Sequence, residues 1–217
     1  MSVSLRCYST SLGCPKNRVD TERLLGSLGV RLVPVDAPDE ADLVFINTCA
    51  FIQPATEESV RTIAQAVADI EDLPKRPLLA VAGCLVGRYH AEDLAPELPE
   101  VDLWLDNSDL EAWPAMLARK LGLPEPTVPG RILSTGPSYA WLKISDGCRH
   151  ACSFCAIPNI RGGHRSHTKD MIVREARTLI DQGVKELNLV AQDVTEWGCD
   201  LDGKQDLRVL LDGLFSL

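Results

Sequence analysis

Short apolar runs alternate with longer segments of helical periodicity in the first half of the chain, and this pattern constrains the fold most. Leu43–Asn47 and Leu78–Ala82 are compact runs typical of strands buried on both faces. Helical patterns follow them at Thr56–Ile70 and Arg88–Leu94. Because strands that alternate with helices pair in parallel, the sequence predicts an α/β fold with helices on both faces of a sheet.

The remaining segments extend this pattern and divide it. Residues 123–137 contain six prolines and glycines and predict a linker between a first domain, 1–122, and a second, 138–217. Further elements expected in the first domain are strands at Leu5–Tyr8 and Val101–Leu105 and helices at Asn17–Leu28 and Asp109–Gly122. Those expected in the second are strands at Tyr139–Ile144 and Glu186–Ala191, a loop to His167, and helices at 168–181 and 205–217.

Composition narrows the class of protein. The 217 residues are 45% hydrophobic and 24% charged, which is typical of a soluble globular chain. The net charge of −9, most of it in residues 1–131, does not favour a general polyanion binder. No apolar run approaches the ~20 residues that span a bilayer, so no membrane partner is expected. Residues 1–10 lack the apolar core of a signal peptide, so we expect a cytoplasmic protein with reduced cysteines.

Three cysteines in the second domain form a CxxxCxxC motif, with Cys148, Cys152 and Cys155 in one polar loop. Three thiolates within eight residues can surround one inorganic centre. A structural zinc site takes four ligands, whereas three thiolates suit a 4Fe–4S cluster with one open iron. The alternative is a zinc site whose fourth ligand is a nearby histidine: His150, His164 or His167.

Three other cysteines each follow a predicted strand or its extension. They are Cys14, Cys49 and Cys84, and glycine precedes the first and the last. Loops at the carboxyl ends of parallel strands converge on one crevice, so these thiols can form a second three-thiolate site. The alternative is that all three are buried structural cysteines. Of the remaining two, Cys7 is expected in the core and Cys199 has no assigned role.

These motifs resemble a known family. CxxxCxxC with Phe154 before its last cysteine is similar to the cluster loop of radical S-adenosylmethionine (SAM) enzymes. Gly-Cys-Pro-Lys-Asn, Asn-Thr-Cys-Ala-Phe-Ile and Gly-Cys-Leu-Val-Gly-Arg-Tyr resemble the amino-terminal domain of methylthiotransferases. The resemblance covers essentially the whole chain. It implies an open parallel-sheet amino-terminal methylthiotransferase domain followed by the first part of a radical SAM partial TIM-type barrel.

The resemblance also implies cofactors and ligands. The cofactors are two 4Fe–4S clusters and SAM, and no catalytic residue is assigned beyond the cluster ligands. Those metal ligands are Cys14, Cys49, Cys84, Cys148, Cys152 and Cys155. The residues implied in cofactor binding are Phe154, Ile157, Pro158, Gln192 and Asp193. Core packing of Phe154, and a plain loop turn at Gln192 and Asp193, are the alternatives.

Local sequence distinguishes two branches of the family. Cys14-Pro15-Lys16-Asn17, Cys49-Ala50-Phe51-Ile52 and Val190-Ala191-Gln192-Asp193 resemble the branch that modifies a ribosomal protein. That branch adds a methylthio group to the β-carbon of an aspartate in small-subunit ribosomal protein number twelve. It implies that protein as substrate and a reductant such as flavodoxin or ferredoxin as partner. The alternatives are a tRNA adenosine methylthiotransferase and a non-catalytic iron–sulfur or zinc module.

One departure from the family pattern concerns length. Complete family members continue through the rest of the barrel and end in a small β domain called TRAM. Only residues 138–217 follow the predicted linker, so the chain resembles an amino-terminal fragment. Catalysis by these residues alone is not expected, and neither is direct nucleic-acid binding without TRAM.

Overall fold

The structure is a computed structural model that describes residues 4–217. The chain divides into two compact units, Met1–Ile132 and Leu133–Leu217. The division falls inside the segment 123–137 that the sequence predicts as a linker. Each unit is described by itself.

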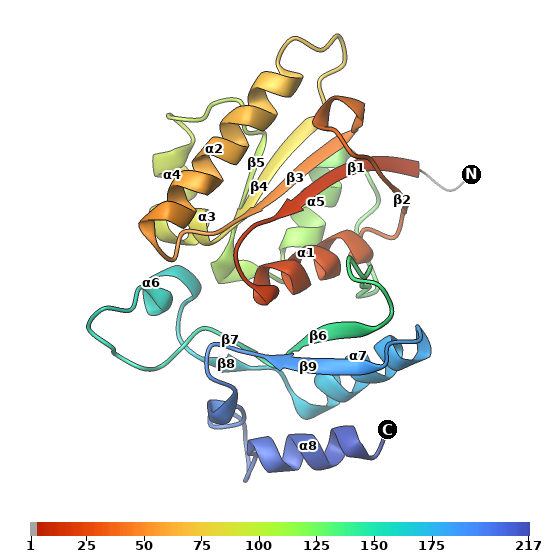
Figure 1. The fold of residues 1–217 in the computed structure, drawn as a ribbon, viewed down its shortest axis with the longest axis vertical. Coiled ribbons are helices and arrows are strands. Elements are labelled where there is room, and N and C mark those ends of the chain that lie inside the picture. The colour runs from red at the N-terminus through yellow and green to blue at the C-terminus, as the bar shows by residue number, and fades with distance from the viewer. Residues whose placement is uncertain (1–3) are drawn as a thin grey trace. The chain divides into compact units, whose positions relative to one another are not determined.

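The first unit is built on one sheet of five parallel strands in the order β2-β1-β3-β4-β5 (Figure 1). The predicted α/β fold with an open parallel sheet is confirmed. The strand order reverses beside β1, where ligands commonly bind in this kind of fold. Strand β2 was not expected, because this edge strand is only four residues long, ends at a proline and is half-buried. The strands are β1 (Ser4–Ser11), β2 (Arg31–Pro34), β3 (Leu43–Thr48), β4 (Leu78–Gly83) and β5 (Leu103–Asp106).

Helices cover both faces of this sheet (Figure 1). One face carries α1 (Pro15–Ser27) and α5 (Trp113–Leu121), and the other carries α2 (Gln53–Ile70) with α3 (Cys84–Tyr89). The expected single helix over Arg88–Leu94 is wrong, because α3 ends at Tyr89 and α4 (Ala91–Leu94) begins after His90. His90 has a φ of 60°, which interrupts a right-handed helix. Short 3-10 turns lie at η1 (Pro38–Glu40) and η2 (Asn107–Asp109).

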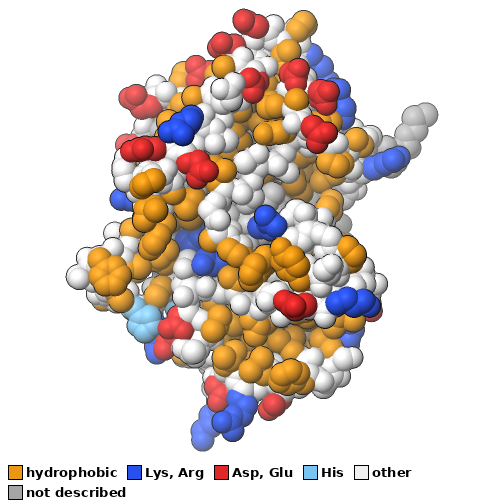
Figure 2. Space-filling view, viewed as in Figure 1, with side chains coloured by type: hydrophobic (Ala, Val, Ile, Leu, Met, Phe, Trp, Pro, Cys, Tyr) orange, Lys and Arg blue, Asp and Glu red, His pale blue; other side chains and the backbone are white. Residues whose placement is uncertain are grey.

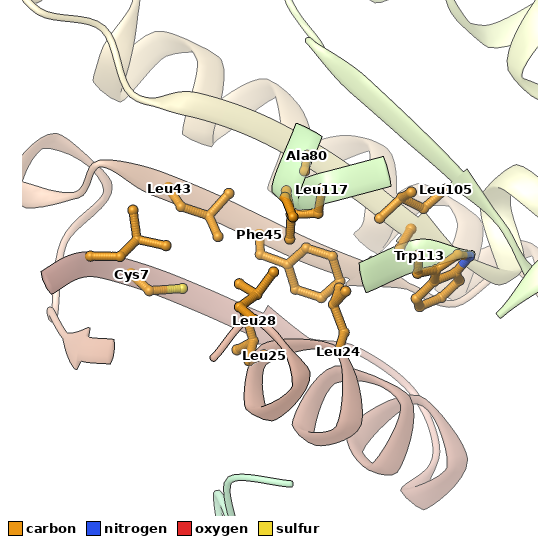
Figure 3. Packing of buried hydrophobic residues seen from close by; sticks show 13 residues of the cluster. Cys7, Leu24, Leu25, Leu28, Leu43, Phe45, Ala80, Leu105, Trp113 and Leu117 are labelled. Atoms are coloured by element: carbon orange, nitrogen blue, oxygen red, sulfur yellow. The ribbon is translucent and has the colours of Figure 1, made fainter. Parts of the chain in front are cut away.

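The hydrophobic core between the sheet and α1 and α5 is shown in Figure 3. Leu24 and Leu25 of α1 and Leu28, which caps its carboxyl end, pack with Phe45 of β3. Trp113 of α5 joins them, and its indole Nε1 donates a hydrogen bond to the carbonyl oxygen of Asp106 at 2.7 Å. Cys7 is buried in this cluster, as expected of a core cysteine. The packing fixes the sheet and thereby the loops at its carboxyl edge.

The second unit combines a parallel pair of strands, an antiparallel pair and three helices. The loop expected up to His167 is wrong in part, because it contains α6, β7 and β8. These elements are two to five residues long, too short to show periodicity in a sequence. The strands are β6 (Tyr139–Lys143), β7 (Ser145–Asp146), β8 (Arg165–Ser166) and β9 (Glu186–Val190). The helices are α6 (Ile157–Arg161), α7 (Lys169–Asp181) and α8 (Leu207–Phe215), with a 3-10 turn at η3 (Val194–Glu196).

A separate core holds the second unit together. Leu142 of β6 packs with Ile172 of α7, Leu210 of α8 and Trp197, all nearly fully buried. Helix α7 begins as expected, because the Thr168 side chain accepts a hydrogen bond from the Met171 backbone N–H at 3.3 Å. Within residues 4–217, no helix is long and apolar enough to cross a membrane.

Candidate metal centres

Cys14, Cys49 and Cys84 lie at one edge of the first sheet. β1, β3 and β4 are neighbours and parallel, so their carboxyl ends share that edge. Asn47 of β3 pairs with Ser11 on one side and Ala82 on the other. Cys49 and Cys84 each lie two residues beyond this row, and Cys14 lies three beyond it. The sheet therefore brings together three cysteines that are far apart in the sequence.

Two glycines allow the backbones of these turns to approach closely. Gly13 has a φ of +83°, and a Cβ there would lie 2.7 Å from the Cβ and 2.8 Å from the Sγ of Cys49. The Cys49 side chain thus lies against the residue that precedes Cys14. Gly83 has a φ of +99°, and a Cβ there would lie 2.6 Å from the Thr48 carbonyl oxygen. Only glycine fits such positions without strain.

The turn that carries Cys49 is held from two helices. The Cys49 backbone N–H donates to Ser59 Oγ of α2 at 3.0 Å, and the same hydroxyl donates to the Cys49 carbonyl oxygen at 2.7 Å. Arg88 of α3 donates to the carbonyl oxygen of Ala50 at 2.7 Å. This part of the site is therefore fixed by the fold rather than by a ligand.

The donor set fits an iron–sulfur centre. All three cysteines are free thiols, and thiolate is the preferred ligand of such clusters. Cys14 is the N-cap of α1 but makes no capping hydrogen bond with its side chain, so its sulfur is available to a metal.

Cys148, Cys152 and Cys155 lie in the loop between β7 and α6 of the second unit. The Cys148 backbone N–H donates to the Gly162 carbonyl oxygen at 3.2 Å, and the Cys155 N–H donates to the Cys152 carbonyl oxygen at 3.0 Å. Cys148 and Cys155 are half-buried, whereas Cys152 is exposed. The loop is thus closed on itself, with three sulfur donors of the kind that fits a cluster.

A buried ionic network lies beside this loop. Asp146, two residues before Cys148, forms ion pairs with Lys143 at 2.7 Å and with Arg161 at 3.0 Å. His167 Nε2 lies 3.5 Å from the same carboxylate. Burial alone would raise the pKa of Asp146, but the charges of Lys143 and Arg161 and a hydrogen bond from His167 hold it well below its usual range. An ionised Asp146 therefore joins β6, β7 and the end of α6 around the loop.

Each histidine that the sequence offered as a fourth zinc ligand has an acidic neighbour. His150 Nε2 lies 3.3 Å from Asp193, and His164 Nε2 lies 3.5 Å from Asp200. His167 belongs to the Asp146 network. Each of these imidazoles therefore has a ring nitrogen beside a carboxylate of the second unit.

The residues implied in cofactor binding flank the loop or follow β9. Phe154 is 89% exposed, so it does not pack in the core, and Ile157 and Pro158 begin α6 half-buried. Gln192 has a buried amide nitrogen with no hydrogen-bond partner among residues 4–217. Asp193 accepts hydrogen bonds from Thr195, and these, with the His150 contact, lower the pKa of its carboxyl.

Sequence reasoning missed the polar residues that support both triads. Asn17 and Asn47 support the first, and Lys143, Asp146 and Arg161 the second. Two of them carried a signal, because Asn47 and Lys143 are polar residues at the ends of runs otherwise typical of buried strands. A buried polar group needs a partner, so such positions point to networks.

Two protein families match parts of the chain. Residues 6–106 match a family described as uncharacterized protein family UPF0004, and residues 142–202 match the radical SAM superfamily. A solved structure with a similar fold is the radical SAM methyltransferase TsrM from Kitasatospora setae, described with cobalamin and a [4Fe-4S] cluster bound. It has a TM-score of 0.54 and 12% identity over 90% of this chain and 50% of that chain, which shows a shared fold.

Curated relatives define the family more closely. The ribosomal protein uS12 methylthiotransferase RimO of Nitratidesulfovibrio vulgaris is 67% identical over 97% of this chain and 49% of its own length. RimO of Lawsonia intracellularis is 58% identical over 100% of this chain and 49% of its own length. The chain belongs to the radical SAM methylthiotransferase family, and the resemblance of its cysteine motifs is confirmed. It spans about half the length of the curated relatives it matches.

Proposed function

We propose that these 217 residues provide both cluster sites of a radical SAM methylthiotransferase that modifies ribosomal protein uS12. The observation that carries the proposal is the convergence of Cys14, Cys49 and Cys84 at one edge of the sheet. A radical SAM enzyme that used a single cluster would need only the CxxxCxxC loop. A second built triad in the same chain therefore supports a reaction that needs a second metal centre. The names of the relatives support the substrate.

The loop with Cys148, Cys152 and Cys155 would hold a 4Fe–4S cluster and leave one iron for SAM. When bound, such a cluster supplies the electron that cleaves SAM to a 5′-deoxyadenosyl radical, which takes hydrogen from an unactivated carbon. The chain's part is to orient SAM and limit access of water. Exposed Phe154 and half-buried Ile157 and Pro158 offer apolar surface to the adenine, and the buried Gln192 amide can donate a hydrogen bond to the methionyl group.

The first triad would hold a second 4Fe–4S cluster, which would hold or deliver the sulfur. The absence of a side chain at Gly13 leaves room for the Cys49 side chain, and its absence at Gly83 leaves room for the Thr48 backbone. The hydrogen bonds of Ser59 and Arg88 hold the Cys49 turn in place without using its sulfur. These residues would keep three thiolates around one centre.

The proposed reaction replaces one hydrogen on the β-carbon of an aspartate in uS12 with a methylthio group. The hydrogen would pass to the 5′-deoxyadenosyl radical, and a second SAM would supply the methyl group. That C–H bond is not acidic enough for ordinary side-chain bases, which is why a radical is needed. Acidic side chains are frequent on the first unit, and the face in Figure 2 shows several of them. They suit a basic ribosomal protein as partner. The reductant would be a small electron carrier such as flavodoxin or ferredoxin, and the setting the cytoplasm.

The test uses a chimera, because the relatives are about twice as long as this chain. Residues 1–217 replace the matching half of the N. vulgaris relative. The anaerobically reconstituted protein is then incubated with SAM, reductant and uS12, and the product is analysed by mass spectrometry. We expect uS12 to gain one methylthio group on an aspartate.

Two variants assign the roles of the triads. Cys148→Ala should abolish formation of 5′-deoxyadenosine, whereas Cys49→Ala should retain it and lose methylthio transfer. Cys199→Ala, an exposed cysteine outside both triads, is the matched control and should keep both reactions. Modification of tRNA instead of uS12, or transfer that survives Cys49→Ala, would contradict the proposal.

A further inference from the structure

Asn17 lies in the first turn of α1, three residues after Cys14, and is fully buried. Its amide nitrogen Nδ2 donates hydrogen bonds to the carbonyl oxygen of Leu12 at 2.9 Å and to that of Thr48 at 2.8 Å. Leu12 lies in the turn that leads to Cys14, and Thr48 directly precedes Cys49. One side chain therefore joins two of the three cysteine-bearing turns.

The same amide group also reaches the third turn. Cys84 Sγ lies 3.9 Å from Asn17 Oδ1, with the thiol as donor. Because two carbonyl oxygens accept from Nδ2, the amide can take only one orientation, and its oxygen is the atom that faces Cys84. Asn17 thus contacts the approach to Cys14, the approach to Cys49 and the sulfur of Cys84.

Asn17 is itself held by neighbouring buried residues. Asn47 Nδ2 of β3 donates to the Asn17 carbonyl oxygen at 2.9 Å and to Thr21 Oγ1 at 3.1 Å. Thr21 Oγ1 donates to the same carbonyl oxygen at 3.0 Å. These hydrogen bonds fasten the first turn of α1 to the central strand. Removing the Asn17 amide would leave the buried Thr48 carbonyl oxygen without this donor, which costs more than a surface hydrogen bond.

From this geometry we infer that Asn17 is a positioning residue that sets the separation of Cys14, Cys49 and Cys84 for metal binding. This inference rests on the proposed function, because it requires that the first triad binds metal. Asn17 itself is not a metal ligand in this inference. Outer groups that orient metal ligands typically change metal affinity by 10–100-fold when they are removed, and we expect about that loss here.

The experiment measures Co²⁺ affinity of the full chain by the sulfur-to-cobalt charge-transfer absorption. All proteins carry Cys148→Ala, Cys152→Ala and Cys155→Ala, so that only the first triad can respond. Asn17→Ala is compared with Asn17→Asp, which keeps the size of the side chain but removes both donors. Ser27→Ala is the matched control, because Ser27 is also a buried polar residue of α1 but lies at the opposite end of the helix from Cys14, where its hydroxyl accepts a hydrogen bond from the Gly130 backbone N–H at 3.1 Å. Urea curves of the metal-free proteins show whether each variant folds.

We expect both Asn17 variants to fold and to bind Co²⁺ about 10–100-fold more weakly, while Ser27→Ala binds as the parent does. The intensity and position of the charge-transfer band should also change, because the number of bound sulfurs falls. Equal affinity and band in all folded proteins would overturn the positioning role, and so would loss of the fold in both Asn17 variants. Absence of a charge-transfer band in the parent itself would refute the first metal site, and with it the proposed function.

Discussion

Replacing Gly83 with alanine is expected to destabilise the first unit. Gly83 ends β4, directly precedes Cys84, and has a φ of +99° with a ψ of −154°. An alanine Cβ there would lie 2.6 Å from the carbonyl oxygen and 2.8 Å from the nitrogen of Thr48 on the neighbouring strand. Both contacts are with backbone, which cannot rotate away. Gly83→Ala therefore combines strain of its own backbone with pressure on β3.

The magnitude follows from these two effects. A backbone conformation that is essentially restricted to glycine costs about 1–3 kcal/mol for alanine. Forcing a methyl group into a packed region adds about 1–3 kcal/mol. Gly83→Ala should thus lower the free energy of unfolding of the first unit by roughly 2–6 kcal/mol, a large part of the 5–15 kcal/mol typical of a domain. Gly29→Ala is the matched control, because Gly29 has a φ of +65° but no atom within 4 Å of its Cβ position. It should cost only about 1 kcal/mol.

Hydrogen–deuterium exchange resolves the first unit from the second. Peptides from β3 and β4 should exchange at least about 30-fold faster in Gly83→Ala than in the parent, since 1.36 kcal/mol corresponds to tenfold. Peptides from β6 and β9 report the stability of the second unit. If Gly83→Ala and Gly29→Ala gave the same exchange in β3 and β4, the close approach of these turns at the triad would be refuted.

Three further predictions follow from buried or paired side chains. Asp146→Asn leaves two buried cations without their carboxylate and should destabilise the second unit by about 3–5 kcal/mol. The measurement is hydrogen–deuterium exchange of β6 peptides. The control, Asp181→Asn at the exposed end of α7, should change this exchange little. Burial raises the pKa of the Cys7 thiol to about 12. Iodoacetamide at pH 8 should therefore label exposed Cys152 in the native protein but label Cys7 only in urea. Fast labelling of Cys7 in the native protein would contradict its place in the core. Hydrogen bonds from the Arg6 guanidinium hold the pKa of Asp42 below its usual range. The ionised carboxylate therefore stabilises the metal-free protein above about pH 4, the pKa of an aspartate in the unfolded chain, and this stabilisation is lost as the pH falls below that value. The urea midpoint should therefore drop less between pH 6 and pH 3 in Asp42→Asn than in the parent, and equal drops would show that the ion pair has no such effect.

The sequence predicted the elements that carry periodic apolar residues. Leu43–Asn47 and Leu78–Ala82 correspond to the interior strands β3 and β4 with small changes at their ends, because strands buried on both faces leave a dense apolar run. Strand β2 was missed because only part of Arg31–Pro34 is buried. Helix α6 is a single turn and has no period to detect. The break at His90 arises from its positive φ, which the residue type alone does not predict.

The candidate sites were likewise predictable from the sequence only in part. The cysteines could be singled out because their spacing and their places after strands are visible in one dimension. The residues that hold them could not, because their partners are distant in the sequence. Asn17 reaches the Thr48 carbonyl 31 residues away, and Arg161 reaches Asp146 across the whole cysteine loop. Such pairings depend on the finished fold.

The central claim is that the chain holds two iron–sulfur clusters, one on each cysteine triad. The most direct measurement is iron and acid-labile sulfide per chain after anaerobic reconstitution, in the parent and in variants with either triad changed to alanine. Two clusters would give about eight irons in the parent and about four in each variant. If the Cys14/Cys49/Cys84 variant retained the parent's iron, or if the parent bound zinc in place of iron, the claim would be contradicted.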